Sequence, residues 1–171
     1  YNEAQKPEWI AFIRKADTLH ENFINHFGIE HLKSLSGKEL LTSLFYNDKG
    51  NKLNLCYVLE MDKDMREIFG SIAGGAAYKF GLFFHKKTQS WTCGSPAKPV
   101  KLTENEAIQK AEEIRNDLVA GAEIISSFGP LNSTADYEQL YKQLEHISGI
   151  NTVWRMKYYQ MLFPILFAPF Y

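Results

Sequence analysis

The spacing of apolar residues divides the chain into helical flanks and a strand-like middle. Apolar residues that recur every three or four positions predict amphipathic helices, whose starts and stops are marked by capping residues and glycines. A serine or threonine followed three residues later by glutamate forms a capping box at Ser36 to Glu39 and again at Thr103 to Glu106. The helices expected on this basis cover about 7–27, 37–45, 103–121, 134–148 and 151–163.

The middle of the chain is rich in β-branched and aromatic residues and is punctuated by glycine and proline. This pattern predicts an antiparallel meander with strands at 68–72, 78–86 and 90–93, a hairpin turn at 86–90 and an exit from the sheet at 96–99. The Gly74-Gly75 pair is expected to form a tight turn between strands. Residues 52–62 fit both helical spacing and strand alternation, so their pattern does not choose between the two.

Helices at both ends around one group of strands predict an α+β fold, with a central antiparallel sheet at about 68–93 packed by the flanking helices. The chain of 171 residues, of which 45% are hydrophobic, has the size and apolar content of a single domain spanning residues 1–171. Its first residues lack both an initiator methionine and a signal peptide, and its last residues are strongly apolar. We therefore expect the N-terminal fragment of a longer protein.

The apolar end of the chain is not expected to cross a membrane. Residues 161–171 carry no charge, but the stretch contains two prolines and is far shorter than the roughly 20 residues that a transmembrane helix needs. Only two cysteines are present, Cys56 and Cys93, which we expect to be reduced, packed thiols and not a disulfide. These features predict a cytoplasmic protein that does not bind membranes.

Motifs that carry catalysis or metal binding are missing from the sequence. The glycines at 70–75 lack the lysine and hydroxyl residues of a phosphate-binding loop, and the five histidines have no zinc-ligand spacing. Glu60, Asp62 and Asp64 lack the remaining ligands of a calcium loop, and no serine stands in a nucleophile elbow. We therefore expect no enzyme, metal or cofactor, although a catalytic site assembled only by the fold stays open.

Charge is distributed unevenly along the chain. The formal net charge is -1, yet no acidic residue lies between Glu67 and Glu104, and the remaining chain balances to 14 basic and 20 acidic residues. The acid-free window predicts a basic surface on an acidic body. Its five lysines are Lys79, Lys86, Lys87, Lys98 and Lys101.

Aromatic residues are interleaved with these lysines. Phosphate neutralisation by lysine and base stacking on aromatic rings are the two requirements of a nucleic-acid site, so Tyr78 and Trp91 join the lysines as candidate DNA-binding residues. The competing interpretation is that the aromatic residues of a sheet pack in the core. If it holds for Trp91, alanine there unfolds the domain without reporting on binding.

Two stretches resemble the region ahead of the motor in McrB-like AAA+ restriction proteins. They are Phe69-Gly70-Ser71-Ile72-Ala73-Gly74-Gly75-Ala76-Ala77-Tyr78-Lys79-Phe80-Gly81-Leu82-Phe83 and Asn151-Thr152-Val153-Trp154-Arg155-Met156-Lys157-Tyr158-Tyr159-Gln160-Met161-Leu162-Phe163-Pro164. The resemblance implies a target-recognition domain for double-stranded DNA, with a modified base as a candidate target. It also implies a motor domain later in the same chain and a partner nuclease. Lys79, Arg155 and Lys157 lie inside the resembling stretches and become candidate DNA contacts, whereas Trp154 is expected to anchor the last helix in the core.

Three functions thus stay open. The preferred one is DNA binding within a restriction system. The alternatives are a protein-interaction or scaffold module of a multidomain defence ATPase, and an enzyme whose site forms only in the folded chain.

Overall fold

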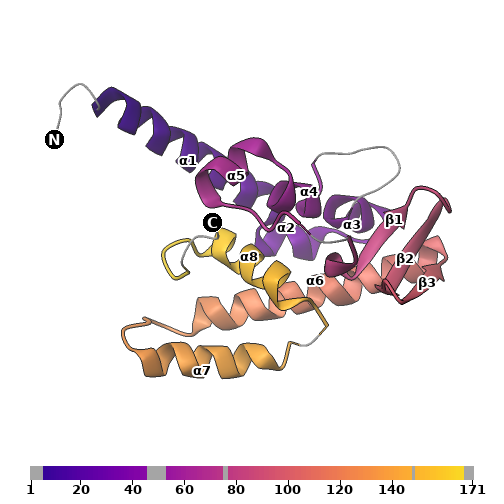
Figure 1. Ribbon diagram of the computed structural model, residues 1–171. Helices are drawn as coiled ribbons and strands as arrows, with labels where there is room; N and C mark the ends of the chain where they lie inside the picture. The colour runs from indigo at the N-terminus through magenta and orange to yellow at the C-terminus, as the bar shows by residue number, and fades with distance from the viewer. Residues whose placement is uncertain (1–5, 46–52, 75–76, 148, 168–171) are drawn as a thin grey trace.

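The computed structural model describes residues 6–45, 53–74, 77–147 and 149–167, and it shows an α+β fold (Figure 1). Helices dominate the described residues, and one small antiparallel sheet lies at one end of them. The elements in chain order are α1(Lys6–Phe27), α2(Ile29–Ser34), α3(Gly37–Leu44), α4(Leu55–Glu60), α5(Lys63–Phe69), the 3-10 helix η2(Ala77–Phe80), β1(Leu82–His85), β2(Ser90–Ser95), β3(Lys98–Leu102), α6(Glu104–Ser127), α7(Thr134–Glu145) and α8(Thr152–Leu162).

Helix α6 is the centre of the packing. It contacts α2, α3, α7, α8 and all three strands, and α7 runs back along it after a short connection (Figure 1). Its start is fixed by the expected capping box, in which Glu106 N–H donates to the Thr103 hydroxyl and Thr103 N–H donates to the Glu106 carboxylate. The helix continues to Ser127, past the predicted end near Gly121. Gly121 is buried inside it, where α8 approaches so closely that an added Cβ would overlap the Tyr159 hydroxyl.

The aromatic core is built around α8. Trp154 is fully buried between Phe45 and Phe80, with ring centroids 5.9 Å and 5.4 Å away, so the expectation that it anchors the last helix is confirmed. Tyr158 is also buried, and its hydroxyl donates to the Phe27 carbonyl at the end of α1. The last helix therefore joins the first helix, the end of α3 and the sheet region into one core.

The structure contains the predicted antiparallel sheet, but the strand boundaries differ from the prediction. The strand order is β1-β2-β3, both pairs are antiparallel, and the β1–β2 turn covers the predicted hairpin residues. Residues 98–102 form the edge strand β3 instead of leaving the sheet. An edge strand accepts Pro99 because a missing N–H costs no ladder bond on its solvent side. Gly94 makes the tight β2–β3 hairpin possible, since its φ is +91° and a Cβ would lie 2.5 Å from the Lys98 carbonyl oxygen.

The predicted first strand at 68–72 is wrong. The Asp62 side chain caps α5 by accepting from Met65 N–H at 2.9 Å, so the helix runs to Phe69 and ends at Gly70, whose φ is +70°. Residues 77–80 likewise form the helix η2 and not the start of a strand. In each case a local capping or turn interaction outweighs the β propensity of the side chains. The turn expected at Gly74-Gly75 falls partly on residues outside those described.

Several smaller expectations are settled by the fold. The ambiguous segment becomes α4, capped by Asn54, while the short helix α2 was not expected. Ser36 is the N-cap residue of α3, but its side chain makes no capping hydrogen bond, so the capping box predicted there does not form. Ser133 caps α7 through a capping box with Asp136, at the expected start of this helix. Cys56 and Cys93 are both free thiols, as expected.

Candidate nucleic-acid interface

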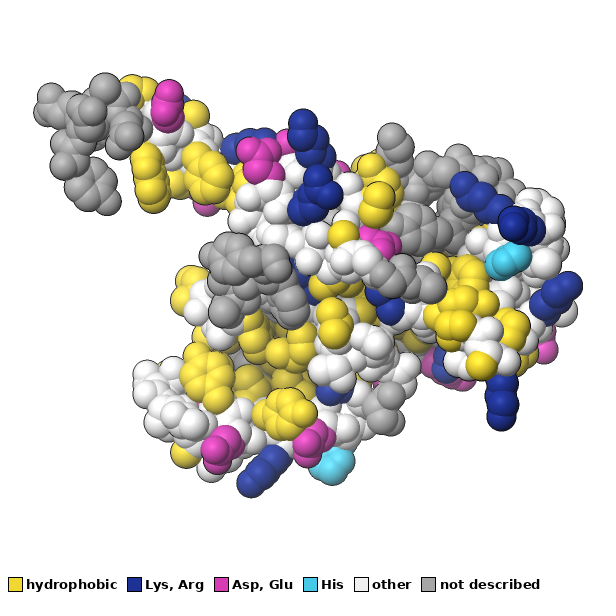
Figure 2. Space-filling view, in the orientation of Figure 1, with side chains coloured by type: hydrophobic (Ala, Val, Ile, Leu, Met, Phe, Trp, Pro, Cys, Tyr) yellow, Lys and Arg dark blue, Asp and Glu magenta, His cyan; other side chains and the backbone are white. Residues whose placement is uncertain are grey.

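Four of the predicted DNA-binding lysines are exposed around the sheet: Lys86, Lys87, Lys98 and Lys101. Lys86 and Lys87 lie on the turn between β1 and β2. Lys101 pairs with Thr92 near the same end of the sheet, whereas Lys98 lies at the opposite end, in the β2–β3 hairpin. Three residues along a strand separate Lys98 from Lys101, a distance of about 10 Å. Figure 2 shows Lys and Arg side chains projecting from the end of the molecule where the sheet lies.

These four lysines differ from most other described lysines in their charge environment. Within the part of the chain that the structure describes, ion pairs engage five lysines, and none of these is one of the four. Ion pairing within the protein neutralises a lysine before a phosphate arrives, and the four sheet lysines keep their charge for an external anion. The paired lysines are Lys15, Lys33, Lys38, Lys79 and Lys110.

Lys79, the fifth of the predicted lysines, does not share the exposure of the other four. Its ammonium forms a close ion pair with Glu60 and also donates to the Ile72 and Gly74 carbonyl oxygens at 2.8 Å and 2.7 Å. The side chain is only 16% exposed. Lys79 therefore braces the loop before η2 against α4, and three donor positions are already used on the protein itself. We remove it from the interface.

The predicted stacking residues are also placed differently. Trp91 is 7% exposed and packs edge to face against Phe84, with ring centroids 5.5 Å apart, so it belongs to the core between the sheet and the helices. Tyr78 is half-buried and packs edge to face on Phe83 at 4.7 Å. Trp91 therefore offers no open face of the kind that base stacking requires, and the Tyr78 ring is partly covered by Phe83. The competing interpretation, core packing of Trp91, is the one that the structure supports.

Arg155 and Lys157 lie inside the protein and not on a DNA-facing surface. Arg155 is 6% exposed, and its guanidinium donates to the carbonyl oxygens of Leu144, at 2.9 Å, and Ile147 where α7 ends. Lys157 is 1% exposed and donates to the Phe69 carbonyl and, at 2.6 Å, to the Gln160 side chain. Burial lowers the pKa of Lys157 from 10.5 to about 8. Both cations stabilise chain turns by donating to backbone carbonyls, Arg155 at the end of α7 and Lys157 at the end of α5.

Other chemistries find no support in the described residues. No group of three or more histidine, cysteine, aspartate or glutamate side chains lies close enough there to hold a metal ion. None of the helices in the described ranges is both long and apolar enough to span a membrane. Comparisons of the chain with protein-family models, curated proteins and solved structures found no match. The resemblance to McrB-like proteins therefore stays a hypothesis.

The sequence missed two apolar surfaces that the fold leaves exposed. One is the first half of α1, and the other is a groove between α7 and α8. Their residues are visible in the sequence as apolar helical stripes. Periodicity assigns such stripes to a core, and it contains no signal for whether a neighbouring element covers them.

Proposed function

We propose that this domain binds double-stranded DNA through the phosphate backbone, using the four exposed lysines around the sheet, Lys86, Lys87, Lys98 and Lys101, which are together called here the lysine surface. The observation that carries the proposal is that these four lysines are exposed and take part in none of the ion pairs among the described residues, while most other described lysines do. Cations on a hairpin turn and an edge strand reach phosphates more readily than base edges.

Binding by this surface is expected to be insensitive to DNA sequence. Trp91 and Tyr78, the side chains proposed to read or stack on a base, are engaged with Phe84 and Phe83. Base selectivity and a role in a restriction system therefore rest on the family resemblance of residues 69–83 and 151–164 alone. A phosphate-binding loop in a following motor domain would support that role.

The test is a fluorescence-anisotropy titration of a labelled duplex at several salt concentrations. Each lost phosphate contact reduces the slope of log affinity against log salt by about 0.9, so Lys86/Lys87→Ala is expected to flatten it by up to about 1.8 units. Lys98/Lys101→Ala is expected to do the same. Both variants should weaken binding equally for unrelated duplex sequences.

A matched control is the Lys63/Arg66→Ala variant. It also removes two positive charges, but from exposed positions on α5, away from the sheet. If it weakens binding as much as Lys86/Lys87→Ala, general electrostatic attraction and not the lysine surface is responsible. If the unaltered domain fails to bind duplex DNA even at low salt, DNA binding is rejected. If the domain binds single-stranded nucleic acid more tightly than duplex DNA, single-stranded nucleic acid is the ligand instead.

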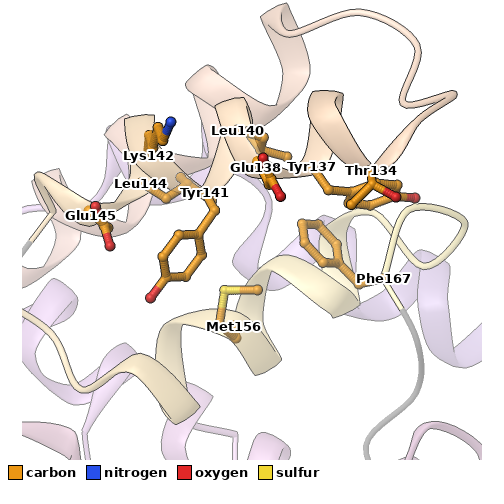
Figure 3. A pocket seen from close by; sticks show the side chains of 10 residues that line it. All are labelled: Thr134, Tyr137, Glu138, Leu140, Tyr141, Lys142, Leu144, Glu145, Met156 and Phe167. Atoms are coloured by element: carbon orange, nitrogen blue, oxygen red, sulfur yellow. The ribbon is translucent and has the colours of Figure 1, made fainter.

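A second function, protein–protein interaction, is favoured by a separate observation. The groove between α7 and α8 is lined mainly by apolar side chains and stays open in the described residues (Figure 3). Open apolar grooves of this kind are a common site for an amphipathic helix of a partner.

A further inference from the structure

The β1–β2 turn contains a chain of hydrogen bonds between side chains. Ser90 Oγ lies 2.8 Å from Thr88 Oγ1, which in turn lies 2.9 Å from His85 Nδ1. The backbone N–H of Thr88 donates to His85 Nδ1 at 3.2 Å and also to the His85 carbonyl oxygen at 3.2 Å. Because a backbone N–H can only donate, Nδ1 is the acceptor. The Thr88 hydroxyl therefore donates to Nδ1 and accepts from the Ser90 hydroxyl.

The same turn is closed a second time by the residue between these two hydroxyls. The Gln89 side-chain amide donates to the Lys86 carbonyl oxygen at 2.7 Å, and the backbone of Gln89 has a φ of +47°, which residues other than glycine seldom adopt. His85 and Ser90 are paired directly across the end of the β1–β2 ladder. Two members of the lysine surface, Lys86 and Lys87, therefore stand between residues whose side chains bond to one another.

We infer that His85 and Thr88 are positioning residues of the lysine surface: their hydrogen bonds fix the backbone that presents Lys86 and Lys87 before phosphate arrives. The inference rests on the proposed DNA binding. Neither His85 nor Thr88 needs to touch DNA for this role. A turn that is ordered in the free protein loses less conformational entropy on binding, so it binds more tightly than a mobile turn with the same charges.

The location of these hydrogen bonds restricts their effect to the turn. All of them join residues within 85–90, and residues 86–89 are exposed. His85 also packs its ring near that of Phe83, with centroids 6.3 Å apart. Loss of the hydrogen bonds should therefore release the turn and leave the packing of the sheet on the helices unchanged.

Thr88→Val tests the hydroxyl. Valine keeps the β-branched shape of threonine without a donor or acceptor, so duplex affinity in the anisotropy titration should fall about fivefold, the factor expected when binding must order the backbone of one more residue. Thr88→Ser keeps the hydroxyl and should bind like the unaltered domain. The slope of log affinity against log salt should stay the same in Thr88→Val, because both lysines still reach phosphate. A flattened slope would mean that the phosphate contacts themselves are lost, which contradicts a positioning role.

Substitutions of His85 separate the hydrogen-bond acceptor from the ring. His85→Phe keeps a ring that packs near Phe83 but has no acceptor, whereas His85→Asn lacks the ring and offers an amide oxygen close to the position of Nδ1. Both variants remove the imidazole and any charge on it, so a difference between them reports the acceptor. We expect about fivefold weaker binding for His85→Phe and nearly full affinity for His85→Asn. The opposite order would assign His85 to ring packing and overturn the inference.

Nuclear magnetic resonance of the free domain measures the order of the turn without DNA. The heteronuclear NOE values of the Lys86 and Lys87 amides should fall in Thr88→Val and His85→Phe, while those of β2 should not change. Circular dichroism should show unaltered helix content, and a loss of helix would mean that these residues support the whole fold instead of the turn.

The combined results distinguish failure of the positioning role from failure of DNA binding. If the unaltered domain binds duplex DNA and both variants bind it equally well, or if their Lys86 and Lys87 amides stay as ordered as before, the positioning role is rejected and DNA binding stands. If the unaltered domain binds no duplex DNA, the proposed function is rejected and the inference is rejected with it.

Discussion

Replacing buried Lys157 by methionine should remove a specific dependence of stability on pH. Burial lowers the pKa of this ammonium in the folded protein from 10.5 to about 8. Between that value and the unfolded pKa of about 10.4, the unfolded chain binds more protons than the folded one, so the free energy of unfolding rises with pH. Methionine has a similar length but does not titrate, and it abolishes this contribution.

The magnitude follows from the two pKa values. A folded pKa of about 8 against an unfolded value of about 10.4 contributes an increase of at most about 2 kcal/mol between pH 7 and pH 9.5. Below pH 7 the contribution is flat, since both states are then protonated.

Other groups titrate in or near the same window, which determines the design of the measurement. Burial raises the pKa of the Cys56 thiol, and this effect lowers stability as the pH rises past the ordinary thiol value. Burial also raises the pKa values of Tyr158 and Tyr159, which destabilises the folded protein only above about pH 10. These groups are present in both proteins, so the pH dependence of the difference between the unaltered domain and Lys157→Met isolates Lys157.

Urea unfolding at half-unit steps from pH 7 to pH 9.5 is the assay. Lys63→Met, at an exposed position of α5, is the control and should follow the unaltered protein. If the unaltered domain and Lys157→Met show the same pH dependence over this window, the ammonium is not desolvated in the fold. The assignment of Lys157 to the protein interior would then be refuted, and a surface role would be open again.

Three further predictions test the core packing and the helix capping of the fold. Gly121→Ala should destabilise by about 1 to 3 kcal/mol, because its Cβ would overlap the Tyr159 hydroxyl, and Tyr159→Phe should recover part of the loss in thermal unfolding. Trp91→Ala should cost about 3 to 5 kcal/mol in urea unfolding, and a change much below this would mean that the ring is exposed. Thr103→Ala should cost about 0.5 to 2 kcal/mol by removing the cap of α6, whereas an unchanged midpoint would argue against the capping box.

The sequence was a good guide where a signal is local. The capping box at Thr103 and the apolar stripes predicted the positions of α1, α6, α7 and α8 nearly correctly. Local signals were weaker in the middle, where β-rich residues at 68–72 proved to be the end of a capped helix and a loop. Of the candidate site residues, only the lysines of the hairpin turn and the edge strand are exposed as expected. A lysine in an acid-free window can still meet an acid that is distant in the sequence, as Lys79 meets Glu60.

The sequence by itself determined the α+β class, the free thiols and the basic window around the sheet. Each of these depends on composition or on neighbours a few residues apart. Tertiary structure alone decided which cations and aromatic rings face water, because burial depends on elements that pack from elsewhere in the chain. The fold buries Trp91, which packs in the core, and buries Arg155 and Lys157, which donate to backbone carbonyls. It leaves Lys86, Lys87, Lys98 and Lys101 exposed. It also left the apolar residues in the first half of α1 exposed, since the same periodicity is found in a helix that is covered by a core and in one that is not.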